Sequence, residues 1–201
     1  MYVIGLTGGI ACGKSTVSEA LRREGAAIVD ADAIAHELSR PGGAVYDFYV
    51  REFGGDILAA DGTLDRGEIA RHVFADPHVR DRVNARVHPL IRAAATDKIA
   101  DLRAEGHAAI VLDVPLLFEA GWHRMTDESW VVSVPEDVQL ARLMARDTAM
   151  SEAEARARIA AQMPLAEKCA RADVVIDNSG TKEETLHMIE RIWRERVVRA
   201  V

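Results

Sequence analysis

The chain has 201 residues, of which 49% are hydrophobic and 28% are charged, and its formal net charge is −7. This length and composition can bury one substantial core, so we expect one main domain. The acidic balance argues against a nucleic-acid-binding protein, which would usually present a basic surface, but it allows an anionic small molecule held by local dipoles and a few cations. The sequence has no export signal and no apolar run of the roughly 18 residues that a membrane helix needs, so we expect a cytoplasmic protein with no membrane partner.

The first predicted elements form a strand–helix–strand unit. Residues 2–7 are a short apolar run that ends at a glycine pair, which is typical of a buried parallel strand. Apolar residues then recur at helical spacing from Lys14 until Gly25 ends the pattern. Residues 27–29 predict a second strand, which completes a βαβ unit with an expected right-handed crossover.

The middle of the chain, about residues 33–105, changes character. It is largely helical and charged, and it shows little strand pattern. Turn signals at residues 41–43, 61–62 and 76–77 separate its segments. We interpret this region as a helical insertion on an α/β core.

The last part of the chain alternates strands and helices. Apolar runs predict three strands, at residues 108–113, 128–134 and 173–177. Helical patterns lie at residues 136–147 and 151–162, and the final helix places one stripe toward the core, made of Leu186, Ile189, Trp193 and Val197. The alternation predicts an α/β fold, a doubly wound five-stranded parallel sheet with helices on both faces.

The strongest motif is Gly8-Gly9-Ile10-Ala11-Cys12-Gly13-Lys14-Ser15-Thr16, which matches GxxxxGK[ST] between a strand and a helix. Glycines let several backbone N–H groups approach a phosphate, and the helix N-terminus adds the positive end of its dipole. Lys14 can reach the β- and γ-phosphates, and the Ser15 hydroxyl can ligate Mg²⁺. We therefore predict an ATP site formed by Gly8 and the residues from Ala11 to Thr16, with Mg²⁺ as the cofactor. Cys12 could be a reactive thiol at a helix N-terminus, but we favour a small residue in a tight turn.

Two carboxylates follow predicted strands, where the ligand crevice of a parallel sheet is expected. Asp32 could accept the proton of an attacking hydroxyl, or it could cap the helix that begins near Ala33, and Asp30 could share these tasks. Asp113 ends the third strand, where it could ligate the metal or be an ordinary polar residue at a strand end.

Arginines cluster late in the chain. Arg142 and Arg146 are one helical turn apart on one face, and we expect both to contact the phosphates of ATP. Arg156 and Arg158 lie on the next helix among glutamates, and we interpret them as part of a solvated face.

Segments over nearly the whole chain resemble the dephospho-CoA kinase family, in the family's order. They are Gly5-Leu6-Thr7-Gly8-Gly9, Val29-Asp30-Ala31-Asp32, Phe53-Gly54-Gly55, Asp61-Gly62-Thr63-Leu64-Asp65-Arg66, His88-Pro89-Leu90-Ile91, Asp113-Val114-Pro115-Leu116-Leu117-Phe118-Glu119 and Ala172-Asp173-Val174-Val175-Ile176-Asp177-Asn178. Many enzymes share the phosphate loop, whereas the segments at 61–66 and 115–119 are far more specific. The family's loop more often has Gly-Ser where this chain has Ala11-Cys12.

The resemblance implies a fold of the nucleoside-monophosphate-kinase type. Its P-loop core would comprise residues 1–31, 106–147 and 165–201, with a helical substrate-binding insertion at 32–105 and a lid at 148–164. ATP would donate its γ-phosphate to the ribose 3′-hydroxyl of dephospho-CoA, in the last step of coenzyme A synthesis. The expected partners are these two small molecules and no nucleic acid, and the expected state is a monomer or a small homo-oligomer.

The resemblance also implies roles for single residues. Asp32 matches the family's proposed base, and Lys14 and Arg142 would stabilise charge on the phosphoryl group. Asn178 and Gly180 would lie at the adenine pocket.

The acceptor site would include His88, Leu117 and Phe118. His88, Arg92 and Arg86 are available for the diphosphate of the acceptor. His88, which precedes a proline, could equally be a helix-start residue with a buried ring.

Three other functions remain open at this point. The chain could be a kinase for another small acceptor, such as a nucleoside monophosphate or shikimate. It could be a nucleotide-binding switch, although it lacks the Asn-Lys-x-Asp segment expected of a GTPase. It could be a nucleic-acid-remodelling ATPase, against which the acidic charge counts.

Overall fold

The structure is a computed structural model that describes residues 2–198, apart from the side chain of Phe74. The chain divides into two compact units. The core unit comprises Met1–Val29 and Leu102–Val201, and the insertion unit comprises Asp30–Asp101.

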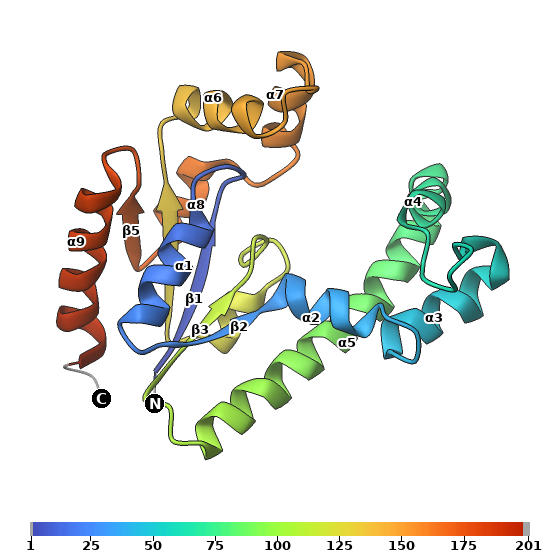
Figure 1. Ribbon diagram of the computed structural model, residues 1–201, viewed down its shortest axis with the longest axis horizontal. Coiled ribbons are helices and arrows are strands. Elements are labelled where there is room, and N and C mark those ends of the chain that lie inside the picture. Colours follow the sequence, from blue (N-terminus) through green and yellow to red (C-terminus); the bar gives the residue numbers. More distant parts are fainter. Residues whose placement is uncertain (1, 199–201) are drawn as a thin grey trace. The chain divides into compact units, whose positions relative to one another are not determined.

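The core unit is built on a five-stranded sheet (Figure 1). Its strands are β1 (Tyr2–Gly8), β2 (Ala27–Asp30), β3 (Ala109–Asp113), β4 (Glu128–Ser133) and β5 (Val174–Asp177), in the order β2-β3-β1-β4-β5. β1 pairs in parallel with β3 and β4, and β4 pairs in parallel with β5. All five strands lie within one residue of their predicted positions, so the predicted doubly wound parallel sheet is confirmed.

The strands are apolar because the sheet is covered by other elements. Ile4, Leu6, Val111, Val132 and Ile176 all have no exposed surface. They belong to one hydrophobic cluster that spans β1, β3, β4 and β5. This core holds the carboxyl ends of the strands in fixed positions.

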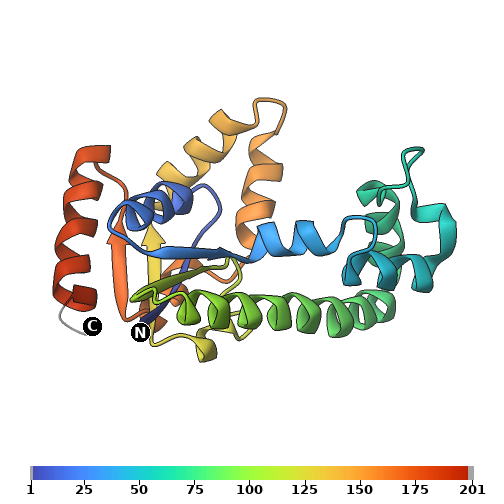
Figure 2. The same ribbon diagram turned by 60° about the horizontal axis from the view of Figure 1, so that its bottom comes forward.

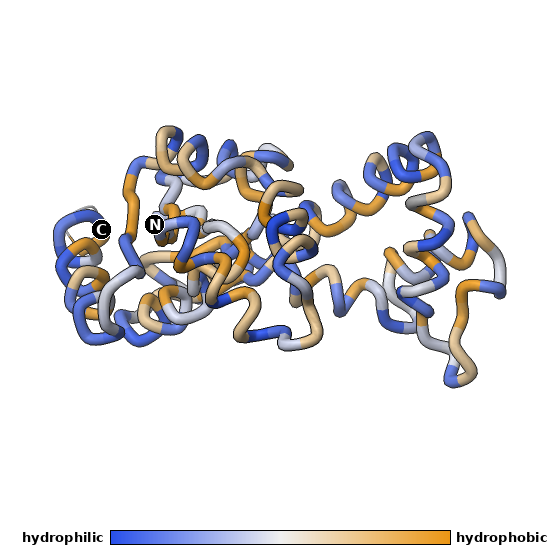
Figure 3. Tube along the Cα trace, turned by 90° about the horizontal axis from the view of Figure 1, so that it is seen from above, coloured by the Kyte–Doolittle hydropathy of each residue, from blue (hydrophilic) through white to orange (hydrophobic). Residues whose placement is uncertain are grey.

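Five α-helices of the core unit are α1 (Lys14–Arg23), α6 (Glu136–Arg146), α7 (Glu152–Ala160), α8 (Leu165–Arg171) and α9 (Lys182–Trp193). α1 and α9 contact each other, and α8 packs against β4. Hydrophilic and hydrophobic residues alternate along α9, as Figure 3 shows. The predicted stripe on the last helix is confirmed, because Ile189 and Trp193 are buried and Val197 is buried in the π-helical turn η3 (Arg194–Val198) that follows.

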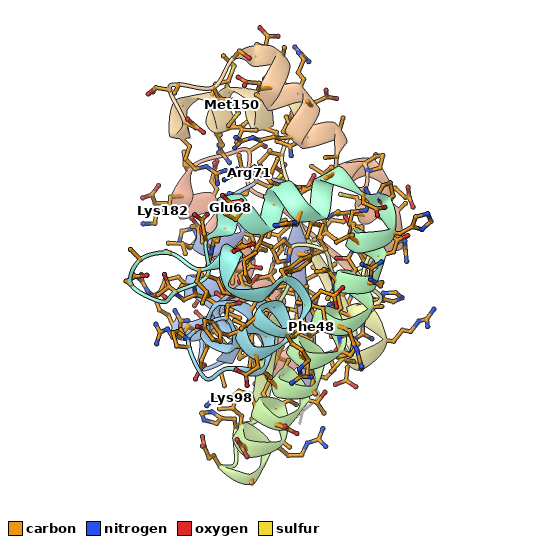
Figure 4. The ribbon with its side chains drawn as sticks, turned by 90° about the vertical axis from the view of Figure 1, so that its right-hand side faces the viewer. Phe48, Glu68, Arg71, Lys98, Met150 and Lys182 are labelled. Atoms are coloured by element: carbon orange, nitrogen blue, oxygen red, sulfur yellow. The ribbon has the colours of Figure 1, made fainter. Side chains whose placement is uncertain are left out.

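The short helix η2 (Trp122–Met125) also belongs to the core unit. A small hydrophobic cluster joins α6 and α7. In this cluster Met150, labelled in Figure 4, packs with Leu143 and Ala155. The sequence pattern predicted α6 and α7, but not α8.

The insertion unit is helical, as predicted. It contains α2 (Ala31–Leu38), α3 (Ala44–Phe53), η1 (Gly54–Ile57), α4 (Arg66–Ala75) and the long helix α5 (Pro77–Ala104), whose last residues belong to the core unit. All three predicted turns fall between its helices. On α4, Glu68 and Arg71 form an ion pair one turn apart, and both are labelled in Figure 4.

The alternative in which His88 starts a helix is wrong. α5, green in Figure 2, continues through Pro89 without a break, so His88 lies in the middle of the helix. Among the described residues, no helix combines the length and the apolar character that crossing a membrane requires.

Candidate active site

The phosphate loop connects β1 to α1 at the carboxyl end of the central strand. In the sheet, β2 and β3 lie on one side of β1, and β4 and β5 lie on the other. A doubly wound sheet opens a ligand crevice where the strand order reverses in this way. Gly13 precedes α1 with a φ of 86°. Ala11 has a φ of 60° and is the only non-glycine residue with positive φ in the part of the chain that the structure describes. An L-residue in this left-handed region costs roughly 1–2 kcal/mol, so Ala11 is strained at a position that glycine would adopt without strain.

The loop presents a set of backbone N–H groups. The N–H groups of Ala11, Gly13, Lys14 and Ser15 have no hydrogen-bond acceptor among residues 2–198. In contrast, the N–H of Cys12 donates to the carbonyl of Gly9 at 3.1 Å. Donors gathered at a helix N-terminus form an anion-binding site, and the helix dipole adds to their attraction.

Lys14 and Asp113 are brought together beside this loop. The Lys14 Nζ forms an ion pair with the Asp113 Oδ1. Asp113 is the last residue of β3 and pairs in register with Leu6 of β1, and its side chain is only 6% exposed. The carboxylate therefore holds the ammonium group at the opening of the loop.

Arg142 also lies at the phosphate loop. Its Nη2 donates to the backbone carbonyl of Asn178 at 3.0 Å. A Cβ built at Gly13 would be 3.9 Å from its Nη1, so the guanidinium borders the loop. Arg146 is one turn further along, at the exposed end of α6.

The arginines of α7 behave as a solvated face, as expected. Arg156 pairs with Glu152 at 2.8 Å, and Arg158 lies 3.8 Å from Asp147. Both arginines are more than half exposed. Pairs of this kind contribute little to stability.

Cys12 is a packed residue of the loop. Its side chain has no exposed surface, and this burial raises the pKa of the thiol above its ordinary value. The favoured interpretation of Cys12 as a small residue in a tight turn is thus supported over that of a reactive thiol.

Asn178 supports the loop with its side chain. Its Nδ2 donates to the carbonyl of Cys12 at 2.8 Å, and its Oδ1 accepts from the Thr185 hydroxyl at 3.0 Å. The side chain is buried and engaged by protein groups, and its predicted place at the adenine pocket stays a prediction. Gly180 lies in the exposed turn between β5 and α9.

The Pro-Leu-Leu-Phe-Glu segment contributes to the core. Leu117 has no exposed surface and lies against Gly5, where an added Cβ would be 3.0 Å from its methyl groups. Phe118 is 5% exposed, and the guanidinium carbon of Arg171 lies 4.7 Å from its ring centroid. Both side chains are thus buried, and their predicted part in forming the acceptor site stays a prediction. Leu116 is the exposed apolar residue of the segment.

The insertion unit contains its own cavity, of about 1050 Å³. Asp32 lies on its wall, together with the basic side chains of His36, Arg40 and Arg66. Arg66 Nη2 lies 2.8 Å from His36 Nδ1. No sequence pattern assigned a role to these three basic residues, although Arg66 ends one of the segments that resemble the family.

Asp30 and Asp32 have different positions at the start of α2. Asp30 is the N-cap, because its Oδ1 accepts from the N–H of Asp32 at 2.9 Å and from that of Ala33 at 3.1 Å. The alternative in which Asp32 caps the helix is therefore wrong. The cap fixes the first turn, so the side chain of Asp32 is carried on a rigid element at the cavity wall.

His88 and Arg92 are not among the side chains that line this cavity, whereas Val87 and Ile91 of the same helix are. His88 is half-buried, and its pKa lies below the ordinary value because of desolvation first and the nearby Arg92 charge second. Arg86 lines a separate cavity of about 610 Å³. The structure thus does not bring the three predicted diphosphate residues together on one wall.

Comparison with known proteins gives a consistent result. A family model described as "Dephospho-CoA kinase" matches residues 2–184. The dephospho-CoA kinase of Symbiobacterium thermophilum is 53% identical over 96% of this chain and 81% of its own length. The solved dephospho-CoA kinase of Campylobacter jejuni is similar with a TM-score of 0.74 and 27% identity, over 99% of this chain and 98% of that one. A shikimate kinase from Bacteroides thetaiotaomicron, with a TM-score of 0.56 and 15% identity over 96% of this chain and 98% of that one, shares the fold.

Proposed function

The chain belongs to the dephospho-CoA kinase family, and we propose that it transfers the γ-phosphate of ATP to the ribose 3′-hydroxyl of 3′-dephospho-CoA. The products are CoA and ADP, and the reaction is the last step of coenzyme A synthesis. The observation that carries this proposal is the phosphate loop with its unpaired N–H groups beside Lys14, in a chain that matches the family over nearly its whole length.

The loop binds the donor in this proposal. The N–H groups of Ala11, Gly13, Lys14 and Ser15 hold the phosphates, with Gly8 and Thr16 completing the turn. Lys14 leaves Asp113 for the γ-phosphate, and Arg142 adds a second positive charge from α6. Lys14 and Arg142 then stabilise the charge that develops on the migrating phosphoryl group.

Mg²⁺ fits the oxygen donors at this position. Ser15 supplies a hydroxyl and Asp113 a carboxylate, both of which are ligands that Mg²⁺ accepts. No group of three or more His, Cys, Asp or Glu side chains that could hold a metal occurs among the described residues. This suits Mg²⁺, which is commonly bound by one or two protein ligands together with substrate phosphates and supplies charge neutralisation there.

The acceptor is bound by the cavity of the insertion unit. Its basic residues Arg40, Arg66 and His36 suit the diphosphate of the acceptor, and its apolar residues suit the pantetheine arm. Asp32 on the same wall accepts the proton of the attacking hydroxyl. Residues 148–164 form the lid that excludes water, and Arg146 contacts ATP at its edge.

The function is tested by a substrate assay. Purified protein with ATP and Mg²⁺ should convert dephospho-CoA to CoA, with ADP release that depends on the acceptor. AMP and shikimate serve as the competing acceptors, because the fold alone is compatible with them. Consumption of AMP or shikimate in place of dephospho-CoA would refute the assignment.

The role of Asp32 is tested by Asp32→Asn. Loss of the general base should lower the turnover number by about 10²–10⁴-fold and leave the affinity for ATP nearly unchanged. Asp30→Asn is the matched control, because asparagine caps a helix as well as aspartate does and turnover should stay close to that of the wild type. Equal loss of ATP binding in Asp32→Asn would show that Asp32 is structural or close to the metal.

A further inference from the structure

Three carboxamide side chains outside the GxxxxGK[ST] motif contact the backbone of the phosphate loop. Gln139 on α6 donates from Nε2 to the carbonyl of Ile10 at 2.8 Å. Gln162, which follows α7, accepts from the N–H of the same Ile10 at 3.0 Å. Asn178, which follows β5, donates to the carbonyl of Cys12 at 2.8 Å. Side chains from three separate parts of the chain thus bind the backbone of Ile10 and Cys12 in one loop.

Two of these side chains are themselves firmly held. Gln139 is 3% exposed and Asn178 is 8% exposed. Asn178 is fixed further by the Thr185 hydroxyl at its Oδ1 and by the Arg142 guanidinium at its backbone carbonyl. A buried donor that is fixed by its neighbours can impose its direction on a flexible loop.

The direction that these donors impose follows from the geometry of the peptide bond. In a trans peptide the carbonyl of one residue and the N–H of the next point in opposite directions. When Gln139 holds the Ile10 carbonyl, the N–H of Ala11 is turned away from Gln139. When Asn178 holds the Cys12 carbonyl, the N–H of Gly13 is turned away from Asn178. These two N–H groups are among those that have no acceptor in the described part of the chain.

Two glycines of the loop, Gly9 and Gly13, lie where the carboxamide nitrogens come closest to the backbone. A Cβ at Gly9 would be 2.6 Å from the Gln139 Nε2. A Cβ at Gly13 would be 2.1 Å from the Asn178 Nδ2. Both distances are too short for any side chain, so these glycines allow the carboxamides to reach the backbone.

We propose that Gln139 and Asn178 are positioning residues that aim the N–H groups of Ala11 and Gly13 at the phosphates of the bound nucleotide. Gln162 adds a second contact to Ile10 by accepting a hydrogen bond from its N–H. The proposal rests on the proposed use of this loop as the nucleotide site. It assigns to the two carboxamides the part of the affinity that depends on the β-phosphate, because the loop N–H groups surround that phosphate.

The test compares ADP with AMP, which lacks the β-phosphate. The dissociation constants of both nucleotides are measured by calorimetry for the wild type, Gln139→Met and Asn178→Leu. The ratio of the AMP constant to the ADP constant should fall about tenfold in each variant, because a misdirected N–H loses a charge-assisted hydrogen bond. A purely structural role would change both constants alike and leave the ratio at the wild-type value, which would overturn the proposal.

Thr185→Val is the graded comparison. It removes the hydrogen bond that fixes Asn178 Oδ1 and leaves the bond to Cys12, so its ratio should fall less than that of Asn178→Leu. If an apolar variant does not fold, Gln139→Ala and Asn178→Ala are judged by the same ratio. A wild type that binds ADP no better than AMP would overturn the proposed nucleotide site as well, whereas normal discrimination in the variants would overturn the positioning role alone.

Discussion

At the scale of single residues, the burial of Cys12 affects the pKa of its thiol more than its position near a helix N-terminus does. A helix N-terminus stabilises a thiolate, yet burial raises the pKa of this thiol. Because the raised pKa reduces the thiolate fraction at every pH below it, we predict that Cys12 reacts with iodoacetamide about tenfold more slowly than the partly exposed Cys169 between pH 7 and 8.5. Mass spectrometry of the labelled peptides measures both rates.

The same peptides give the control for this prediction. In the denatured protein both thiols should react at similar rates, because neither retains its environment. Faster labelling of Cys12 than of Cys169 in the native protein would contradict the assignment of Cys12 as a packed residue.

At the scale of elements, Lys168 joins α8 to the segment that follows β3. Its side chain has no exposed surface, and its Nζ lies 2.9 Å from the Glu119 Oε1 and 3.0 Å from the Pro115 carbonyl. Glu119 also accepts from the N–H of Met163 at 3.2 Å. One ion pair therefore connects α8, the Pro115–Glu119 segment and the end of the proposed lid.

Removing one partner of this ion pair should lower the free energy of unfolding more than replacing both partners. Glu119→Gln leaves a buried ammonium without its counter-charge, so we expect a loss of about 3 kcal/mol in the free energy of unfolding. Adding Lys168→Met should recover part of this loss, since the apolar chain fills the site without a charge. Urea denaturation of the two single variants and the double variant measures the coupling, and strictly additive losses would contradict it.

At the scale of the whole molecule, the proposed donor and acceptor residues belong to different compact units. We predict that ADP with Mg²⁺ slows amide hydrogen exchange in the phosphate loop of the core unit. Dephospho-CoA alone should slow exchange in α2 and around Arg66 of the insertion unit, which line the cavity there. Hydrogen exchange read by mass spectrometry measures both patterns.

Shikimate is the control ligand for this experiment, and it should change neither pattern. Protection by dephospho-CoA that is confined to the core unit would contradict the assignment of the insertion-unit cavity to the acceptor.

The sequence by itself determined the fold class, the five strands and the phosphate loop. Buried parallel strands are visible as apolar runs, and the loop is a local motif whose glycines and lysine serve backbone geometry and charge. The core-facing stripe of the last helix was also predictable, because helical periodicity alone places those residues on one face.

Only the tertiary structure decided which neighbouring residue faces a site. On α5, a rotation of about 100° per residue separates Val87 and Ile91, which line the cavity, from His88 and Arg92. Asn178 holds the loop because β5 pairs with β4, the neighbour of β1, and because α9 packs against α1. The ion pair of Lys14 with Asp113 spans 99 positions and arises from strand order. Such contacts depend on how distant segments pack, and no local pattern in the chain records that information.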